Sequence, residues 1–101
     1  MGRNQAGVGK RKVTYEVIFT NRARKDLKSI PQKDREDILS KIEWLAKNAA
    51  TIKHEKMKGN PEHSLHVGQF RILYLIDREM RCITIQFVGK HDEVYRRLMR
   101  R

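Results

Sequence analysis

The chain has 101 residues, of which 39% are hydrophobic, and carries a net charge of +11. This length fits one domain with a single core, and the apolar content excludes a chain that is disordered throughout. No apolar run approaches the ~18 to 20 residues of a membrane-spanning helix, residues 1–12 do not resemble a secretory signal, and the lone Cys82 cannot form an internal disulfide. We therefore expect a cytoplasmic protein with no membrane association.

Positive charge is concentrated at the two ends of the chain. Residues 1–12 contain four Lys or Arg residues and no acid, and residues 96–101 contain four arginines. Subtracting these two groups from +11 leaves only +3 for residues 13–95. Cationic ends on a mildly basic body favour attraction to nucleic acid, where released counterions supply affinity. The alternative is that this charge only keeps a small protein soluble.

Hydrophobic periodicity defines the elements of the N-terminal half. Residues 1–12 contain three glycines and show no periodicity, which predicts a flexible basic arm. Residues 13–19 carry apolar side chains at every second position and predict a strand. Thr20 is a suitable N-cap for the following helix, and Pro31 ends it because the residue before a proline disfavours the helical conformation.

A second helix is predicted to begin at Pro31 or Gln32, with acids in its first turns, where the helix dipole favours them. Its predicted buried stripe consists of Ile38, Ile42, Leu45 and Ala49, which lie at helical spacing. Leu39 and Ala46 widen this stripe. Two helices joined at a proline predict an antiparallel hairpin. Residues 50–62 then predict a basic loop.

Three strands are predicted in the C-terminal part. Residues 65–67 begin a strand that turns at Gly68, and residues 70–76 form a strand with apolar side chains on both faces, which predicts a central position. After a turn at residues 77–80, the last strand covers residues 82–88. The side chains expected on one face of this last strand are Ile83, Ile85 and Phe87, and Gly89 is expected to end it.

The order of elements predicts an α+β fold of one domain over residues 13–101. An N-terminal strand and an antiparallel helical hairpin precede a three-strand antiparallel meander, and the strands form one sheet with the helices on one face. Residues 93–101 are expected to form a short basic helical end.

Four polar side chains interrupt the apolar alternation. Arg71 follows Phe70 in its strand, so it points away from the helix-covered face and can present a fixed guanidinium to a phosphate. His66 is expected on the same face as Arg71. His91 follows the last strand, where scaffolds often hold catalytic groups, and Tyr95 lies one helical turn further on.

These residue types can cleave RNA without a metal. RNA supplies its own nucleophile, the 2′-hydroxyl, so cleavage needs a base, stabilisation of the phosphorane charge, and an acid for the 5′-oxygen. Either histidine can transfer the protons, Arg71 and Lys90 can stabilise the charge, and Tyr95 can stack on a base or donate a proton. Ordinary structural roles remain open: a surface histidine at position 66, a partly buried Tyr95, and a solvated turn at Lys90 and His91. The four histidines lack metal-ligand spacing, so we expect no metal and no cofactor.

Two C-terminal segments are specific in combination, VGQFRILY at residues 67–74 and VGKHDEVY at residues 88–95. Together with residues 15–19, the helical hairpin and residues 57–59, they make the chain resemble the RelE/ParE superfamily of bacterial and archaeal type II toxins, over roughly residues 13–99. The RelE branch implies a ribosome-dependent mRNA endoribonuclease that inhibits translation. The catalytic residues that the resemblance implies are His66, Arg71, His91 and Tyr95.

The resemblance also implies partners, namely the ribosome, mRNA and a RelB-like antitoxin with an acidic amphipathic helix. The residues expected to bind RNA are Lys56, Lys58, Lys90, Arg96 and Arg97. Ser64 stands where some relatives have a lysine, which argues against a mechanism based on several lysines. Two alternatives remain: a ParE-like toxin that binds DNA gyrase without nuclease activity, and an inactive RNA-binding module. Neither has a chemical need for the four residues, so the nuclease is favoured.

Overall fold

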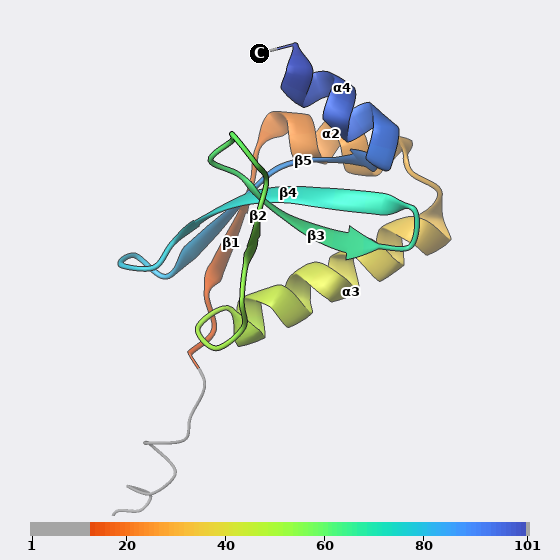
Figure 1. The fold of residues 1–101 in the computed structure, drawn as a ribbon. Helices are drawn as coiled ribbons and strands as arrows, with labels where there is room; N and C mark the ends of the chain where they lie inside the picture. Colours follow the sequence, from red (N-terminus) through yellow and green to blue (C-terminus); the bar gives the residue numbers. More distant parts are fainter. Residues whose placement is uncertain (1–12, 101) are drawn as a thin grey trace, which may run out of the picture.

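The computed structural model describes residues 13–100, so the predicted basic arm at residues 1–12 lies outside the described residues. The elements, in chain order, are β1 (Glu16–Phe19), α2 (Asn21–Ser29), α3 (Gln32–Asn48), β2 (Glu55–Lys56), β3 (His63–Val67), β4 (Phe70–Asp77), β5 (Cys82–Lys90) and α4 (His91–Met99) (Figure 1). Among these residues, no helix is long and apolar enough to cross a membrane.

The five strands form one sheet in the order β1-β5-β4-β3-β2. Strands β3, β4 and β5 make the predicted antiparallel meander, and β1 pairs with β5 in parallel. The two-residue strand β2 pairs with β3 inside the segment predicted as a loop. The α+β class is confirmed, and the sheet has one strand more than the sequence predicts.

The helical hairpin forms as predicted. Thr20 caps α2, because its hydroxyl oxygen accepts a hydrogen bond from the backbone N–H of Ala23 at 3.0 Å. Only Ile30 and Pro31 separate α2 from α3. The predicted stripe of α3 is buried except for Leu39, whose side chain is 41% exposed. That prediction was wrong because Leu39 lies at the border of the stripe and turns toward solvent.

A bulge in β5 corrects the predicted register. The sequence predicts Phe87 on the same face as Ile85, but the structure places them on opposite faces. Leu73 of β4 pairs with Phe87 and the next residue, Tyr74, pairs with Ile85, so Gln86 is the extra residue of a bulge. Side chains alternate along a strand, and one extra residue therefore reverses the side on which Phe87 lies. In addition, β5 continues to Lys90 instead of ending at Gly89.

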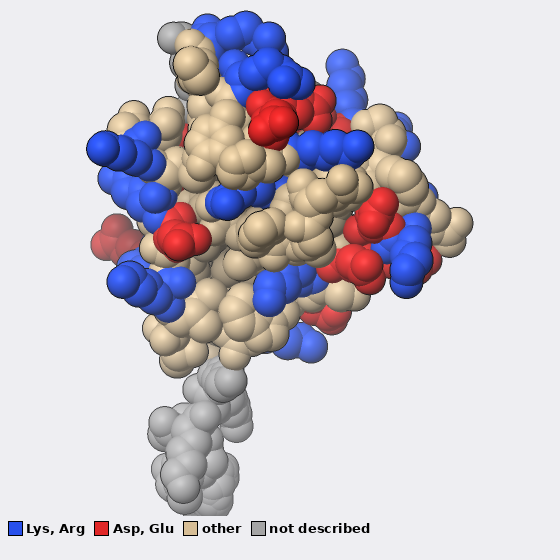
Figure 2. Space-filling model, turned by 45° about the vertical axis from the view of Figure 1, so that its right-hand side comes forward, with Lys and Arg blue, Asp and Glu red and all other residues tan. Residues whose placement is uncertain are grey.

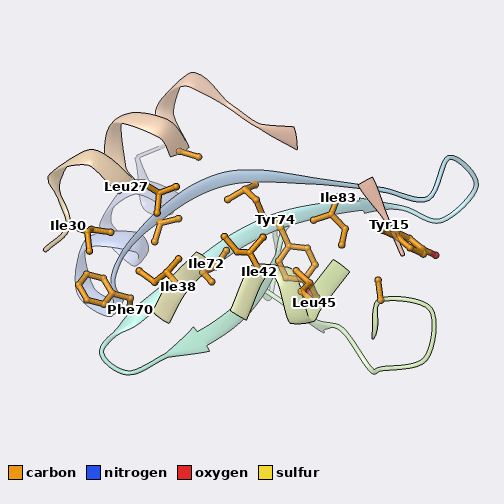
Figure 3. Packing of buried hydrophobic residues seen from close by; sticks show 14 residues of the cluster. Tyr15, Leu27, Ile30, Ile38, Ile42, Leu45, Phe70, Ile72, Tyr74 and Ile83 are labelled. Carbon is orange, nitrogen blue, oxygen red and sulfur yellow. The ribbon is translucent and has the colours of Figure 1, made fainter. Parts of the chain in front are cut away.

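Two hydrophobic clusters cover the two faces of the sheet. The larger cluster packs α2 and α3 against one face (Figure 3) and includes Leu27, Ile38, Ile42, Leu45, Phe70, Ile72, Tyr74 and Ile83. The smaller cluster packs α4 against the other face and consists of Met57, Leu73, Phe87, Val94 and Leu98. Strand β4 is therefore covered on both sides, as its sequence predicts. The second face is the one toward which Arg71 projects.

Two glycines shape the backbone beside the start of α4. Gly68 has φ of +57° in the two-residue turn between β3 and β4, a conformation that favours glycine. The carbonyl of Gln69 in this turn accepts a hydrogen bond from the N–H of His91, the first residue of α4. Gly89 pairs with Arg71, and a Cβ at Gly89 would lie 2.7 Å from a carboxylate oxygen of Glu93. These contacts fix the start of α4 beside Arg71.

Candidate functional site

A cavity of about 460 Å³ opens between α4 and the segment that contains β2. Its lining residues are Glu55, Lys56, Met57, Lys58, Asn60, Ser64, Arg71, Tyr95, Leu98 and Met99. We call it the Arg71 cavity. It brings two of the predicted catalytic residues, Arg71 and Tyr95, together with two of the predicted RNA-binding lysines.

Arg71 is half-buried and held by two side chains. Its Nε–H donates to Nδ1 of His91 at 3.1 Å, and its Nη1 donates to the hydroxyl of Ser64 at 3.0 Å. A guanidinium cannot accept a hydrogen bond, so Nδ1 of His91 is the acceptor in this arrangement. In the neutral ring, the imidazole proton therefore lies on Nε2.

His91 and Tyr95 contact each other on the first turn of α4. Their ring centroids lie 4.5 Å apart at an interplanar angle of 64°, an edge-to-face arrangement. This confirms the prediction that one helical turn brings the two rings together. Both side chains are exposed, and Tyr95 keeps 39% of its surface accessible. Arg71, His91 and Tyr95 thus form a continuous chain of contacts.

His66 is placed differently from the other three. Its Cα pairs with that of Arg71 across the β3–β4 hairpin, and its side chain is exposed. It lines two neighbouring cavities beside Lys41 and Trp44 of α3 rather than the Arg71 cavity. The structure therefore places His66 next to the site by backbone pairing, at the edge of the sheet.

The residues predicted to bind RNA fall into three groups. Lys56 and Lys58 line the Arg71 cavity. Lys90 is the N-cap of α4, and it and Arg96 are exposed. Figure 2 shows Lys and Arg side chains gathered at the end of the molecule that carries α4.

Arg97 forms the third group, because its guanidinium is already bound to protein. It donates to both carboxylate oxygens of Asp26 in α2, at 2.8 and 2.9 Å. The Asp26 hydrogen bond raises the pKa of Arg97 further above its usual value. Asp26 also accepts the N–H of Val88 at 3.0 Å. Arg97 therefore connects α4 to α2 and β5, and a predicted RNA contact has a structural role in the free protein.

Comparison with known proteins places the chain in a family. The sequence model described as the ParE toxin of the type II toxin–antitoxin system parDE matches residues 17–95, which include all four predicted catalytic residues. The chain belongs to this family, within the RelE/ParE superfamily of toxins. A search of curated proteins finds no match.

Solved structures share the fold of the toxin. A chain of the RelBE2 toxin–antitoxin complex from Mycobacterium tuberculosis is 26% identical, with a TM-score of 0.69 over 78% of the toxin and 93% of that chain. A chain of the RelB–RelE complex from Methanococcus jannaschii is 25% identical, with a TM-score of 0.62 over 78% and 95%. A chain of the chromosomal ParDE system from Pseudomonas aeruginosa is 16% identical, with a TM-score of 0.63 over 76% and 96%. Both branches have this fold, so the fold alone does not choose between their activities.

Sequence reasoning missed the contacts that Ser64 and Asp26 make at and near the candidate site. Ser64 is buried and accepts from Arg71, but a serine in a strand carries no signal of such a role. Asp26 had a readable signal, since it is an acid next to Leu27 on the apolar side of α2. A charged residue at such a position requires a partner, although the sequence does not identify that partner as Arg97.

A second polar cluster lies on the opposite face of the sheet, under α3. The Nδ1 of His54 and the hydroxyl of Tyr74 are 2.7 Å apart, and the Nε2 of His54 is 2.8 Å from the carbonyl oxygen of Ala49. That carbonyl can only accept, so Nε2 donates to it. Burial raises the pKa of Tyr74 to about 12. His54 thus connects the end of α3 to the sheet.

Proposed function

We propose that the toxin is a ribosome-dependent endoribonuclease that cleaves mRNA by attack of a 2′-hydroxyl on the adjacent phosphate. The observation that carries the proposal is the chain of contacts from Arg71 through His91 to Tyr95 beside a basic cavity. A toxin that acts by binding alone has no chemical need for an arginine and an imidazole held in this way.

Arg71 is the proposed phosphate ligand. It uses its Nε and Nη1 for His91 and Ser64, and among residues 13–100 its Nη2 has no hydrogen-bond partner. The Nη2 donors can bind a phosphate oxygen while Ser64 holds the other side of the guanidinium. Charge that develops on the phosphorane is then stabilised by a donor that is already oriented.

His91 is the proposed base. Phosphate binding competes for the Nε–H of Arg71, and this competition frees Nδ1 of His91 to take the proton of the 2′-hydroxyl. The 2′-oxygen forms a bond to phosphorus while the bond from phosphorus to the 5′-oxygen breaks. A proton donated to the 5′-oxygen by His66 or Tyr95 completes the step. The products are a 2′,3′-cyclic phosphate and a 5′-hydroxyl.

Tyr95 is also proposed to position a base. Its ring contacts the ring of His91 and lines the Arg71 cavity, and the side chain is exposed. Stacking of a nucleobase on an exposed aromatic ring contributes about 1–3 kcal/mol and tolerates different bases.

The experiment that tests this function adds the purified toxin to translating ribosomes and maps the new 5′ ends of the mRNA. We expect cuts within the coding region where ribosomes are present, with 5′-hydroxyl products and no effect of a chelator. The second candidate is a ParE-like toxin that binds DNA gyrase, which the family match and the ParDE structure support. Inhibition of gyrase supercoiling with intact mRNA would support this second candidate and exclude the nuclease.

The proposal includes an antitoxin partner. The similar structures from M. tuberculosis and M. jannaschii are toxin–antitoxin complexes. The net charge of +11 makes the toxin complementary to an acidic amphipathic helix. We propose that this helix covers the face of the sheet toward which Arg71 projects. Co-expression with the small acidic protein of a neighbouring reading frame should give a stable complex without cleavage activity. Undiminished cleavage activity after co-expression with the protein encoded by each neighbouring reading frame would contradict this part of the proposal.

A further inference from the structure

A second basic cavity lies on the other side of α4 from the Arg71 cavity. It has a volume of about 370 Å³ and is lined by Thr20, Arg22, Gln86, Phe87, Arg97 and Arg100. We call it the arginine pocket. Helix α4 contributes Tyr95, Leu98 and Met99 to the Arg71 cavity, and it contributes Arg97, with its C-cap Arg100, to the arginine pocket. The reaction proposed above uses no part of it.

The arginine pocket carries uncompensated positive charge. Three of its six lining residues are arginines, and none is an acid. Asp26 neutralises Arg97 through the bidentate ion pair. Within residues 13–100, neither Arg22 nor Arg100 forms an ion pair. Arg22 and Arg100 therefore place two positive charges beside the same small space, and a bound anion would reduce their mutual repulsion.

An aromatic ring holds the guanidinium groups in place. The guanidinium carbon of Arg22 lies 5.7 Å from the ring centroid of Phe87, and that of Arg97 lies 5.4 Å from it. Phe87 is only 5% exposed, and it faces this side because of the bulge at Gln86. Cation–π contact with a fixed ring restrains Arg22 before any ligand arrives, so less side-chain entropy is lost on binding.

The side-chain donors that remain for a ligand are the guanidinium groups and the amide of Gln86. The hydroxyl of Thr20 donates to the carbonyl of Gln86 at 2.7 Å and accepts from the N–H of Ala23 at 3.0 Å, so it is already engaged. Guanidinium groups bind phosphate oxygens through paired N–H donors. We propose that the arginine pocket binds a phosphate group of an RNA strand, as a site separate from the Arg71 cavity. The choice of RNA as ligand rests on the proposed function.

Binding of a non-cleavable RNA to the full chain tests this site. The probe is a labelled 2′-O-methyl RNA of about 12 nucleotides, within the usual range of single-strand site sizes. The variant Arg22→Gln/Arg100→Gln removes two charges from the pocket. The control Lys33→Gln/Arg78→Gln removes two charges from residues that line none of the cavities described above.

The pocket variant should bind about 5- to 10-fold more weakly than the control at ~0.1 M salt. The slope of log K against log salt should fall by roughly 0.7 in the pocket variant, since a single strand releases ~0.7 ions per phosphate contact and the pocket binds one phosphate. Equal affinities of the two variants would overturn the proposal. Polyglutamate binding that is weakened as strongly as RNA binding would also overturn it, because the pocket would then be a carboxylate site.

Two further measurements identify the source of the RNA and separate this inference from the nuclease. Weaker binding of the pocket variant to ribosomes without mRNA would assign the phosphate to ribosomal RNA, and weaker binding only in the presence of mRNA would assign it to the substrate. Single-turnover cleavage at saturating toxin should be the same for the pocket variant and the wild type. Cleavage that survives Arg71→Ala would disprove the nuclease site without changing the result for RNA binding.

Discussion

The site depends on one arginine that is oriented before any ligand binds. Ser64 is 5% exposed and fixes one side of the Arg71 guanidinium, and His91 fixes the other side. An oriented guanidinium loses little rotamer freedom on binding phosphate, so more of the interaction energy remains for the transition state. The same contact couples Arg71 to the protonation of His91, because a protonated ring cannot accept from Nε–H.

Protonation of His91 should therefore control the rate of cleavage. The rate of the wild type should fall on acidification, because a protonated ring cannot take the proton of the 2′-hydroxyl. His91→Gln should be slow and should lose this acid limb, whereas His66→Gln should keep it. The measurement is single-turnover cleavage of ribosome-bound mRNA as a function of pH. An acid limb that persists in His91→Gln would assign the base to another group.

His63 gives a second pH dependence, in stability rather than in rate. Burial lowers its pKa, and the positive charges of His54, Lys56 and Arg78 lower it further. The folded state binds this proton less readily than the unfolded state, whose imidazole titrates near ~6.5. The contribution of His63 to the free energy of unfolding is therefore fully present above about pH 6.5. It is lost as the pH falls through the lowered pKa of the folded state.

The test compares urea denaturation of the wild type and His63→Gln above and below about pH 6.5. The variant should lose less stability than the wild type on acidification, because Gln has no proton to bind. His66→Gln, which changes an exposed ring, serves as the control and should follow the wild type. Identical acid sensitivity of all three proteins would contradict the assignment to His63.

At the level of elements, local signals in the sequence were sufficient for the two helices of the hairpin, whereas α4 begins at His91 and not at the predicted residue 93. The cap at Thr20, the stop at Pro31 and the spacing of Ile38, Ile42 and Leu45 are all encoded within a few residues. Alternation along β4 also predicted the face of Arg71 correctly. These features need no knowledge of distant partners.

Features that depend on pairing between distant strands could not be predicted. The strand β2 exists because Glu55 pairs with Ser64, and its two residues are too few to show a period. The bulge at Gln86 depends on the register between β4 and β5. For the same reason the sequence predicted Arg97 as an RNA ligand, since its partner Asp26 lies far away in the chain.

Removal of Asp26 should loosen the attachment of α4. Asp26→Ala leaves the half-buried Arg97 without its carboxylate and the N–H of Val88 without its acceptor. Breaking a buried ion pair in this way costs about 3 kcal/mol, measurable by urea denaturation. The control is Lys47→Ala, which breaks an exposed pair with Glu43 and should cost less than ~0.5 kcal/mol.

Hydrogen exchange provides a local measurement of the same contact. Amide protection should fall more in α4, which carries His91 and Tyr95, than in α3. Equal stability of Asp26→Ala and Lys47→Ala would show that the ion pair does not hold the helix.

At the level of the whole molecule, charge is distributed unevenly between a mildly basic body and strongly basic ends. The four cations of residues 1–12 lie in the segment predicted as an arm, and the arginines of the C-terminal end belong to or follow α4. We expect long-range attraction between this charge and RNA to accelerate association and to be screened by salt. The proposed step at Arg71 assigns no role to residues 1–12.

Deletion of residues 1–12 should weaken ribosome binding and make it less dependent on salt, because four charges are removed. The melting temperature and the single-turnover rate at saturation should not change. A full-length variant with Gln at the four cationic positions is the matched control and should behave like the deletion. Equal affinity of the deletion and the wild type at both low and high salt would leave the arm no role in RNA attraction.

The central claim is that Arg71 stabilises a cleaved phosphate, and the single-turnover cleavage rate of ribosome-bound mRNA tests it most directly. Arg71→Ala should reduce this rate by about 10² or more, the scale of losing one oriented transition-state donor, while the circular dichroism spectrum and melting temperature stay close to those of the wild type. Equal cleavage rates for the folded variant and the wild type would contradict the account.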